Sequence, residues 1–171
     1  PGSGKSTAAK KIAEKLNWPR FYMGEIRRLK AKSLGLTLAQ YNKLGETNPQ
    51  IDLEVDQYLE RLAKKYKNLI IESRTAWHFL PQSVKIYIAV NELTGAKRVF
   101  KELRSHNRRN EDKKLRSVQA VLESHRKRKS SDQRRYKKYY GFNFRGKSNY
   151  DFVLDTTNLN KKQVLDRVYA Y

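Results

Sequence analysis

The chain has 171 residues, of which 38% are hydrophobic, and its 38 Lys and Arg against 17 Asp and Glu give a formal net charge of +21. This length favours a single domain over residues 1–171 with a core of its own. The absence of cysteine excludes disulfides and cysteine-ligated metals and fits a cytoplasmic protein, and no apolar run is long enough to cross a membrane.

The positive charge is concentrated in one part of the chain. Residues 101–150 contain 17 Lys and Arg against five Asp and Glu. Such a field attracts polyphosphates, nucleic acid or other anionic surfaces. A solvated surface without a single partner has the same composition, so the charge alone leaves both possibilities open.

The apolar pattern predicts helices and strands in alternation. The first helix covers residues 5–16, where Ala8, Ile12 and Leu16 recur at helical spacing. The pattern then predicts helices over 24–34, 36–45 (with Thr37 as its cap) and 50–66, strands over 69–73 and 84–90, helices over 92–106 and 112–138, a strand over 150–155 and a helix over 161–169. This order is typical of an α/β fold, a parallel sheet flanked by helices.

The sequence opens on PGSGKST, directly before the first helix. This stretch matches most of the phosphate-binding pattern G-x-x-x-x-G-K-[ST], whose first glycine falls two residues before Pro1. We therefore expect the strand that feeds the loop, the first strand of the sheet, to be missing from residues 1–171. Since that strand normally lies centrally in such sheets, its loss is expected to destabilise the chain.

Each residue type in this loop suits the binding of a phosphate. Backbone N–H groups at a helix N-terminus bind anions, and the helix dipole adds a partial positive charge. Lys5 is expected to reach the β- and γ-phosphates of ATP, and Ser6 to ligate Mg²⁺. The predicted ATP-binding residues are Gly2, Ser3, Gly4, Lys5, Ser6 and Thr7. The loop thus indicates a nucleoside triphosphate but does not identify the acceptor.

The rest of the chain resembles a known family. Five stretches follow PGSGKST in the order seen in the short cytidylate kinases common in archaea: FYMGEIRRLKAKSLGLTLAQYNKLGE, IDLEVDQYLERLAKK, NLIIESRTAW, RRYKKYYGFNF and YDFVLDTTNLNKKQVLDRV. The resemblance implies the fold of the P-loop nucleoside monophosphate kinases, with an acceptor-binding region over about residues 22–66 and a lid over about 125–145. It implies a monomer that transfers the γ-phosphoryl group of ATP to CMP or dCMP with Mg²⁺.

The resemblance assigns several positions to the acceptor nucleotide. Gly24 borders the nucleotide, Arg28 holds its phosphate, and Arg74 contacts the phosphate or the base. Glu72 either orients Arg74 or holds a magnesium-bound water. Asp56 accepts a hydrogen bond from the cytosine amino group, although pairing with neighbouring lysines explains this aspartate equally well.

The resemblance also implies a lid in the basic segment SHRKRKSSDQRRYKKYYG. Here Arg128 and Arg135 match the arginines that act with Lys5 to neutralise the transferring phosphoryl group. A basic solvated helix is the alternative interpretation for any one of them.

Two other functions are compatible with this sequence. The phosphate loop also suits an adenylate kinase or another small-molecule kinase. A P-loop protein associated with RNA or the ribosome would bind nonspecifically through residues 101–150, with Tyr136, Tyr139 and Tyr140 available for base stacking.

Overall fold

The computed structural model describes residues 1–105, 115–144 and 146–171. In chain order its elements are α1 (Lys5–Leu16), β1 (Arg20–Tyr22), α2 (Met23–Ser33), α3 (Leu38–Leu44), α4 (Gln50–Lys65), β2 (Ile70–Glu72), α5 (Ala76–Phe79), β3 (Ile86–Ala89), α6 (Glu92–Ser105), α7 (Val118–Tyr140), η1 (Lys147–Asn149), β4 (Phe152–Asp155) and α8 (Lys161–Ala170). Within the described ranges no helix is both long and apolar enough to cross a membrane.

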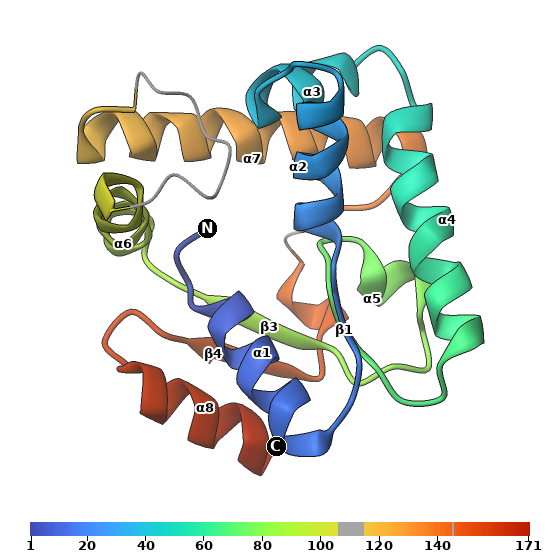
Figure 1. The fold of residues 1–171 in the computed structure, drawn as a ribbon, viewed down its shortest axis with the longest axis vertical. Helices are drawn as coiled ribbons and strands as arrows, with labels where there is room; N and C mark the ends of the chain where they lie inside the picture. The colour runs from blue at the N-terminus through green and yellow to red at the C-terminus, as the bar shows by residue number, and fades with distance from the viewer. Residues whose placement is uncertain (106–114, 145) are drawn as a thin grey trace.

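The strands form two parallel pairs, β1 with β2 and β3 with β4 (Figure 1). Glu72 of β2 and residues 86–88 of β3 line a common cavity. The two pairs therefore face each other across this cavity, and in the described residues no strand ladder joins β2 to β3. The described strands thus form two separate parallel pairs rather than one continuous sheet.

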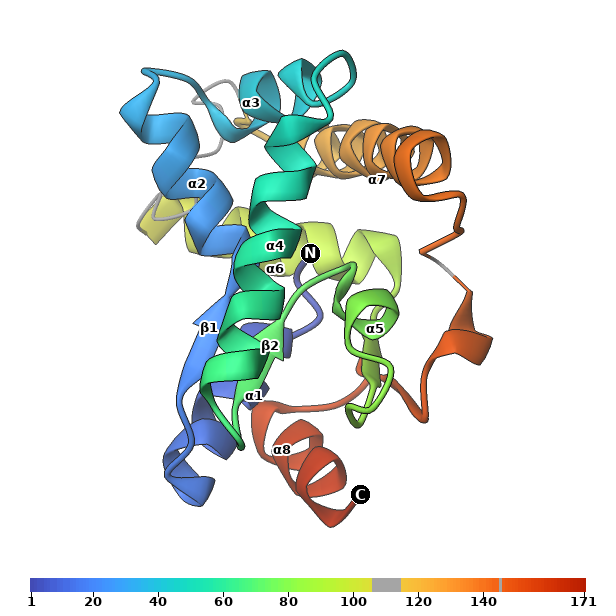
Figure 2. The ribbon, with the colours of Figure 1, turned by 90° about the vertical axis from the view of Figure 1, so that its right-hand side faces the viewer.

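Three apolar clusters pack the elements together, two of them against the strand pairs and one between two helices. Figures 1 and 2 show α1 beside α8, two of the helices so joined. The first joins α1 and α8 to the pair of β3 and β4, the second joins α2 and α4 to the pair of β1 and β2, and the third joins α6 to α7. Their buried members are, in turn, Ala8, Leu154, Val164 and Val168; Met23, Val55, Leu59 and Leu62; and Ala96, Val99, Val121 and Leu122.

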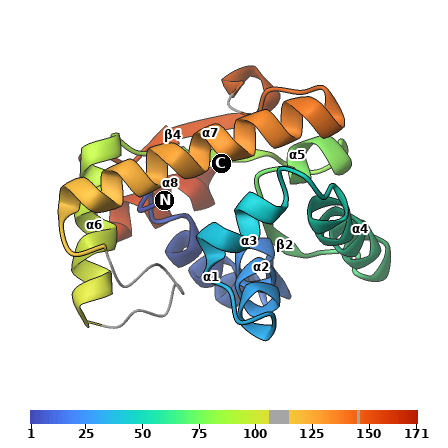
Figure 3. The ribbon, with the colours of Figure 1, turned by 90° about the horizontal axis from the view of Figure 1, so that it is seen from above.

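The long helix α7 lies across one end of the molecule, from α6 on one side to α3 and α4 on the other (Figures 1 and 3). Ser117 caps its N-terminus by accepting a hydrogen bond from the backbone N–H of Ala120. Gly141 ends it with a φ of 75°, a left-handed conformation that favours glycine. Residues on the inner side of α7 line the same cavity as the phosphate loop.

Local signals in the sequence predict most helices closely. The bounds of α1, α2, α4 and α8 lie within one residue of those predicted. Thr37 caps α3 as expected, in a capping box with Gln40. Residue 106 of one predicted helix and residues 112–114 of another lie outside the described residues. The second of these helices is offset, since α7 starts at Val118 and continues to Tyr140.

The pattern predicts neither β1 nor α5. β1 has only three residues, and it takes the strand form by pairing with β2, which lies far along the chain. α5 has four residues, too few for a helical period to be visible. Both elements depend on tertiary contacts rather than on local pattern.

Candidate active site

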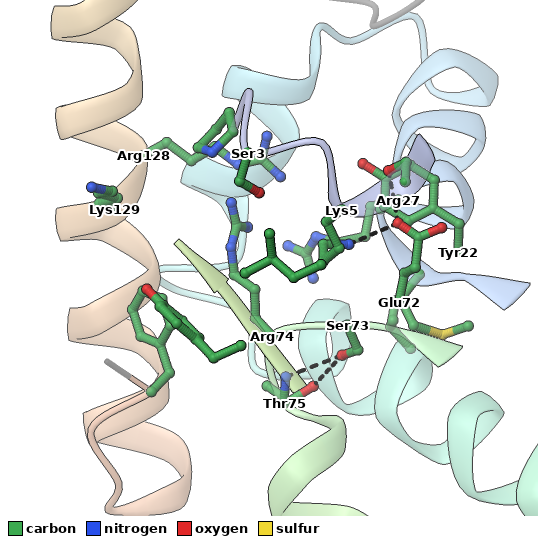
Figure 4. Close-up of a pocket in the computed structure, with 18 of the residues that line it drawn as sticks. Ser3, Lys5, Tyr22, Arg27, Glu72, Ser73, Arg74, Thr75, Arg128 and Lys129 are labelled. Atoms are coloured by element: carbon green, nitrogen blue, oxygen red, sulfur yellow. Dashed lines mark hydrogen bonds and ion pairs between the residues drawn. The ribbon is translucent and has the colours of Figure 1, made fainter. Parts of the chain in front are cut away.

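A cavity of about 260 Å³ lies between the phosphate loop, α2, α4, the loop after β2, and α7 (Figure 4). All but one of the residues predicted from the sequence line it. These are Gly2, Ser3, Gly4, Lys5, Ser6, Thr7, Gly24, Arg28, Asp56, Glu72, Arg74 and Arg128. The exception is Arg135, which is buried behind the cavity wall.

The phosphate loop bends through two glycines in the left-handed conformation. Gly2 has a φ of 77° and Gly4 a φ of 81°. A Cβ atom at Gly2 would lie 2.3 Å from the backbone oxygen of Gly95, whereas one at Gly4 would meet nothing within 4 Å. Glycine is therefore required at Gly2 by both space and conformation, and at Gly4 by conformation. The first turn of α1 contains no acidic residue, which leaves its N-terminus favourable to an anion.

Glu72 joins the end of β2 to the phosphate loop. Its carboxylate is 2% exposed and accepts hydrogen bonds from Lys5 Nζ at 2.9 Å, Ser6 Oγ at 2.7 Å and Arg20 Nε at 2.6 Å. Burial opposes ionisation, but Lys5, Ser6 and Arg20 outweigh it and hold the pKa of Glu72 below its usual value. A serine hydroxyl beside an ionised carboxylate is an all-oxygen donor set that suits Mg²⁺.

Arg28 is fixed by the residues that begin α2. Its Nη1 donates to the Tyr22 hydroxyl at 3.0 Å and to the Gly24 carbonyl at 2.8 Å. Burial raises the pKa of Tyr22, but Arg28 and Lys5 outweigh this effect and lower it. A Cβ atom at Gly24 would lie 2.5 Å from the Tyr22 ring, so a side chain at this position would displace the ring that holds Arg28.

Three arginines converge on Asp132 of α7, whose carboxylate is 1% exposed. Arg74 Nη1 lies 2.7 Å from Oδ2, Arg135 Nη2 donates to Oδ1 at 2.8 Å, and Arg128 Nε lies 4.0 Å from Oδ2. Burial opposes ionisation of Asp132, but Arg74, Arg128 and Arg135 hold its pKa below the usual value. Figure 4 shows Arg74 and Arg128 extending toward the space beside the phosphate loop.

Arg135 makes a second contact that turns it away from the cavity. Its Nε donates to Asp52 Oδ2 at 2.8 Å, and its Nη1 to Ser131 Oγ at 3.0 Å. Arg27 Nη1 donates to the other oxygen of Asp52 at 2.6 Å. The guanidinium of Arg135 thus ties α7 to α4 in this conformation.

Asp56 lies one helical turn beyond Asp52 but has different partners. It is 3% exposed and accepts hydrogen bonds from Thr75 Oγ1 and from the Tyr140 hydroxyl, both at 2.6 Å. In the described part of the chain no Lys or Arg forms an ion pair with it. Burial raises the pKa of Asp56 to about 6, against the lowering effect of the two hydroxyl groups.

The cavity also contains residues that the sequence did not single out as site residues. Tyr22, Arg27, Asp52, Thr75 and Lys129 all line it. The spacing of Asp52 and Asp56 indicates one helix face, and Arg27 is the neighbour of Arg28. No sequence pattern around Thr75 indicates a site residue, because its contact with Asp56 is formed only by the fold.

The chain is similar to known proteins along most of its length. The protein family described as an AAA domain matches residues 1–119. The cytidylate kinase of Methanosarcina mazei is 36% identical over 169 residues, which cover 97% of this chain and 88% of that protein. The cytidylate kinase of Halobacterium salinarum is 32% identical over 177 residues, covering 100% of this chain and 86% of that protein.

Two further relatives differ in kind. An S-adenosylmethionine-dependent nucleotide dehydratase of Lacinutrix mariniflava is 30% identical, but this chain covers only 34% of its length. A crystal structure of an uncharacterized protein from Eubacterium ventriosum superposes with a TM-score of 0.69 at 18% identity, covering 99% of this chain and 91% of that one. This last likeness establishes the fold alone.

The identity to the curated cytidylate kinases extends over nearly the whole of both chains. The aligned region includes the phosphate loop, the loop after β2 and α7, which are three of the segments that meet at the cavity. The chain belongs to the cytidylate kinase family.

Proposed function

We propose that the protein transfers the γ-phosphoryl group of ATP to CMP or dCMP, giving ADP and CDP or dCDP. The observation that carries this proposal is the shared cavity. The phosphate loop lies on one side of it, Asp56 on another, and arginines from three segments lie between them. A triphosphate and a monophosphate bound there would meet end to end.

Phosphoryl transfer depends on positioning and on neutralising charge rather than on covalent catalysis. We propose that Lys5 exchanges Glu72 for the β- and γ-phosphates of ATP. Arg28 and Arg74 hold the acceptor phosphate, and Arg128 neutralises the transferring group. The same role for Arg135 requires it to exchange Asp52 for the substrate, which would accompany movement of α7.

The donor nucleotide is expected to bind with Mg²⁺. Ser6 would ligate the ion directly and Glu72 through a water molecule, in keeping with their oxygen donors and short separation. When bound, the ion supplies positive charge to the phosphate oxygens. A Ser6→Ala variant keeps the loop backbone and loses this ligand, so its activity should require a higher Mg²⁺ concentration.

Asp56 is the proposed reader of the base. Ionised above pH 6, it accepts a hydrogen bond from the exocyclic amine of cytosine. Uracil has a carbonyl oxygen at the same position. This oxygen and the carboxylate are both hydrogen-bond acceptors, so no hydrogen bond can form between them. An Asp56→Asn side chain can donate to that oxygen instead.

A coupled assay with ATP, Mg²⁺ and each of CMP, dCMP, UMP and AMP tests the proposal. At pH 8 we expect turnover of CMP or dCMP, and an Asp56→Asn variant whose CMP-to-UMP preference falls by about tenfold or more. Asp166→Asn, at an exposed position of α8, is the matched control and should keep the preference. Turnover of AMP or of a small metabolite without turnover of CMP would replace this function by one of the other kinase activities.

Nonspecific RNA binding is a second candidate activity, supported by exposed lysines on the outer face of α7. Lys127, Lys137 and Lys138 are exposed, and in the described ranges no acid pairs with them. The three tyrosines expected to stack on bases each have contacts within the fold. Tyr136 is 5% exposed, Tyr139 donates to the Gly45 and Glu46 carbonyls, and Tyr140 donates to Asp56. The exposed lysines would supply the electrostatic part of RNA binding by α7.

We infer a monomer that works in the cytoplasm. The proposed substrates are nucleotides, and the sequence contains no cysteine for disulfides. All the residues assigned to the donor, the acceptor and the ion come from a single chain. Sedimentation of the protein with and without ATP and CMP measures the oligomeric state.

A further inference from the structure

Arg98 of α6 reaches two loops at once. Its Nη1 donates to the Gly2 carbonyl of the phosphate loop at 3.3 Å. Its Nη2 donates to the carbonyls of Thr156 at 3.0 Å, Thr157 at 3.2 Å and Leu159 at 3.4 Å, in the loop that follows β4. In the described part of the chain no carboxylate pairs with this half-buried guanidinium, so neutral oxygen atoms compensate its charge.

Thr156 forms a second connection between the same loops. Its side chain is fully buried, and its Oγ1 lies 2.9 Å from the Ser3 carbonyl and 2.9 Å from the Ala89 carbonyl at the end of β3. The hydroxyl has one proton and donates to either carbonyl in turn. Arg98 Nη1 also lies 3.4 Å from this hydroxyl oxygen. The loop after β4 is therefore held directly against the phosphate loop.

Close packing fixes the position of α6 behind this junction. Gly95 lies one turn before Arg98, and a Cβ atom there would lie 2.7 Å from the Pro1 carbonyl. With no side chain at this position, the helix approaches the phosphate loop at backbone distance. Arg98 can then span both loops with its rigid fork of N–H donors.

We propose that Arg98 and Thr156 are positioning residues for the nucleoside part of the donor. This inference rests on the proposed function, in which the triphosphate of ATP binds the phosphate loop. Thr156 contacts Ser3, and Arg98 bonds both loops, so the loop of residues 156–159 lies directly beside the phosphate loop. The proposal places the nucleoside attached to that triphosphate against this loop. Arg98 and Thr156 set the distance between these two loops. They thereby allow one ligand to place its triphosphate in the phosphate loop and its nucleoside against residues 156–159.

The proposal separates geometry from charge. Arg98→Lys keeps the charge, but a single ammonium cannot span carbonyls of two loops as the guanidinium fork does. Thr156→Val keeps the shape and loses the hydroxyl, whereas Thr156→Ser keeps the hydroxyl. Arg98→Lys and Thr156→Val should therefore have the same effect, and Thr156→Ser should resemble the unmodified protein.

The test compares MgATP with inorganic tripolyphosphate, both measured by direct binding to the full chain without acceptor. We expect Arg98→Lys and Thr156→Val to weaken MgATP binding by about tenfold and tripolyphosphate binding by less than about twofold. KM for ATP should rise while KM for CMP stays unchanged. Arg104→Lys, at an exposed position of the same helix, is the matched control and should bind both ligands as the unmodified protein does.

Two results would overturn the inference. Equal weakening for MgATP and tripolyphosphate would show that the two residues only support the phosphate loop or the fold. Unchanged MgATP binding in Arg98→Lys and Thr156→Val would show that the junction does not position the donor. Both leave the proposed kinase activity intact, whereas an unmodified protein that does not bind MgATP would overturn the activity and the inference together.

Discussion

Two buried aspartates of α4 have opposite electrostatic surroundings. Asp52 lies between the guanidinium groups of Arg27 and Arg135. Asp56 meets only hydroxyl groups among the partners that hydrogen-bond to it. A buried charge with charged partners is costly to remove, whereas a buried charge held by neutral donors is costly to keep. The same substitution should therefore have opposite effects at the two positions.

Asp56→Asn should stabilise the protein in a pH-dependent way. Because the pKa of Asp56 is raised to about 6, the folded state binds its proton more tightly than the unfolded state. Stability is thus lost as pH rises from about 4 to about 6. The variant should have a free energy of unfolding about 3 kcal/mol higher at pH 8 and equal to that of the unmodified protein near pH 4. Urea unfolding at several pH values measures both.

Asp52→Asn provides the matched comparison on the same helix. The loss of this carboxylate leaves Arg27 and Arg135 without their shared counter-charge, at a cost of about 3 to 5 kcal/mol of unfolding free energy.

Destabilisation by Asp56→Asn at pH 8, or a difference in stability that does not depend on pH, would contradict the assignment of the raised pKa to Asp56.

At this scale the sequence indicates types of residue better than their partners. The phosphate loop is a local pattern, so its residues could be assigned from the sequence, and all of them line the cavity. The two partners of Arg135 could not be assigned together from the sequence. Asp132 is a neighbour, three positions away along α7, but Asp52 lies 83 positions away and is brought to Arg135 by the fold. Which of many basic residues faces the cavity is decided by the fold.

Among the elements, α7 is attached along its length to α6, to the loop after β2 and to α4. Lys129 Nζ donates to Glu92 of α6 at 2.7 Å. Further along α7, Asp132 meets Arg74 of the loop after β2, and the hydroxyl of Tyr140 donates to Asp56 of α4. In the middle of this helix the buried carboxylate of Asp132 is the counter-charge for arginines that we assign to phosphates.

Asp132→Asn should lower the free energy of unfolding most in the absence of nucleotides. Arg74, Arg128 and Arg135 would then converge without a carboxylate, which costs about 3 to 5 kcal/mol of unfolding free energy. Bound phosphates supply replacement negative charge, so ATP and CMP together should raise the melting temperature of the variant more than that of the unmodified protein. Thermal unfolding with and without both ligands tests this expectation.

Glu123→Gln is the control for this change, since Glu123 is an exposed residue of the same helix. It should alter the free energy of unfolding by less than about 0.5 kcal/mol. Equal ligand-induced shifts in Asp132→Asn and in the unmodified protein would show that Asp132 and the phosphates do not balance the same arginines.

The elements that the sequence predicts are those with local signals. Thr37 and Gln40 cap α3, and Asn160 and Gln163 cap α8, within a few residues of each helix start. By contrast, β1 becomes a strand by pairing with β2, so its three residues carry no pattern of their own. The α/β class could be predicted because the alternation of helices and strands is also a sequence pattern.

For the whole molecule, the net charge of +21 exceeds what the cavity requires. Lys127, Lys137 and Lys138 of α7 are exposed and do not line the cavity. A surface of this sign destabilises the compact state by self-repulsion and attracts polyanions, and salt screens both effects. The affinity for RNA could depend on the position of these lysines or only on the total charge.

Replacing Lys127, Lys137 and Lys138 together by Ser separates position from total charge. A matched triple variant replaces Lys64, Lys65 and Lys67, exposed residues at the C-terminal end of α4 and just after it, and loses the same charge. If α7 binds RNA, only the first variant should lose affinity for a single-stranded RNA, with a shallower dependence on salt between 50 and 200 mM KCl. CMP kinase activity should be unchanged in both, because none of the six residues lines the cavity. Equal losses of RNA affinity would mean that binding follows net charge alone, and α7 would then have no separate role as an RNA-binding surface.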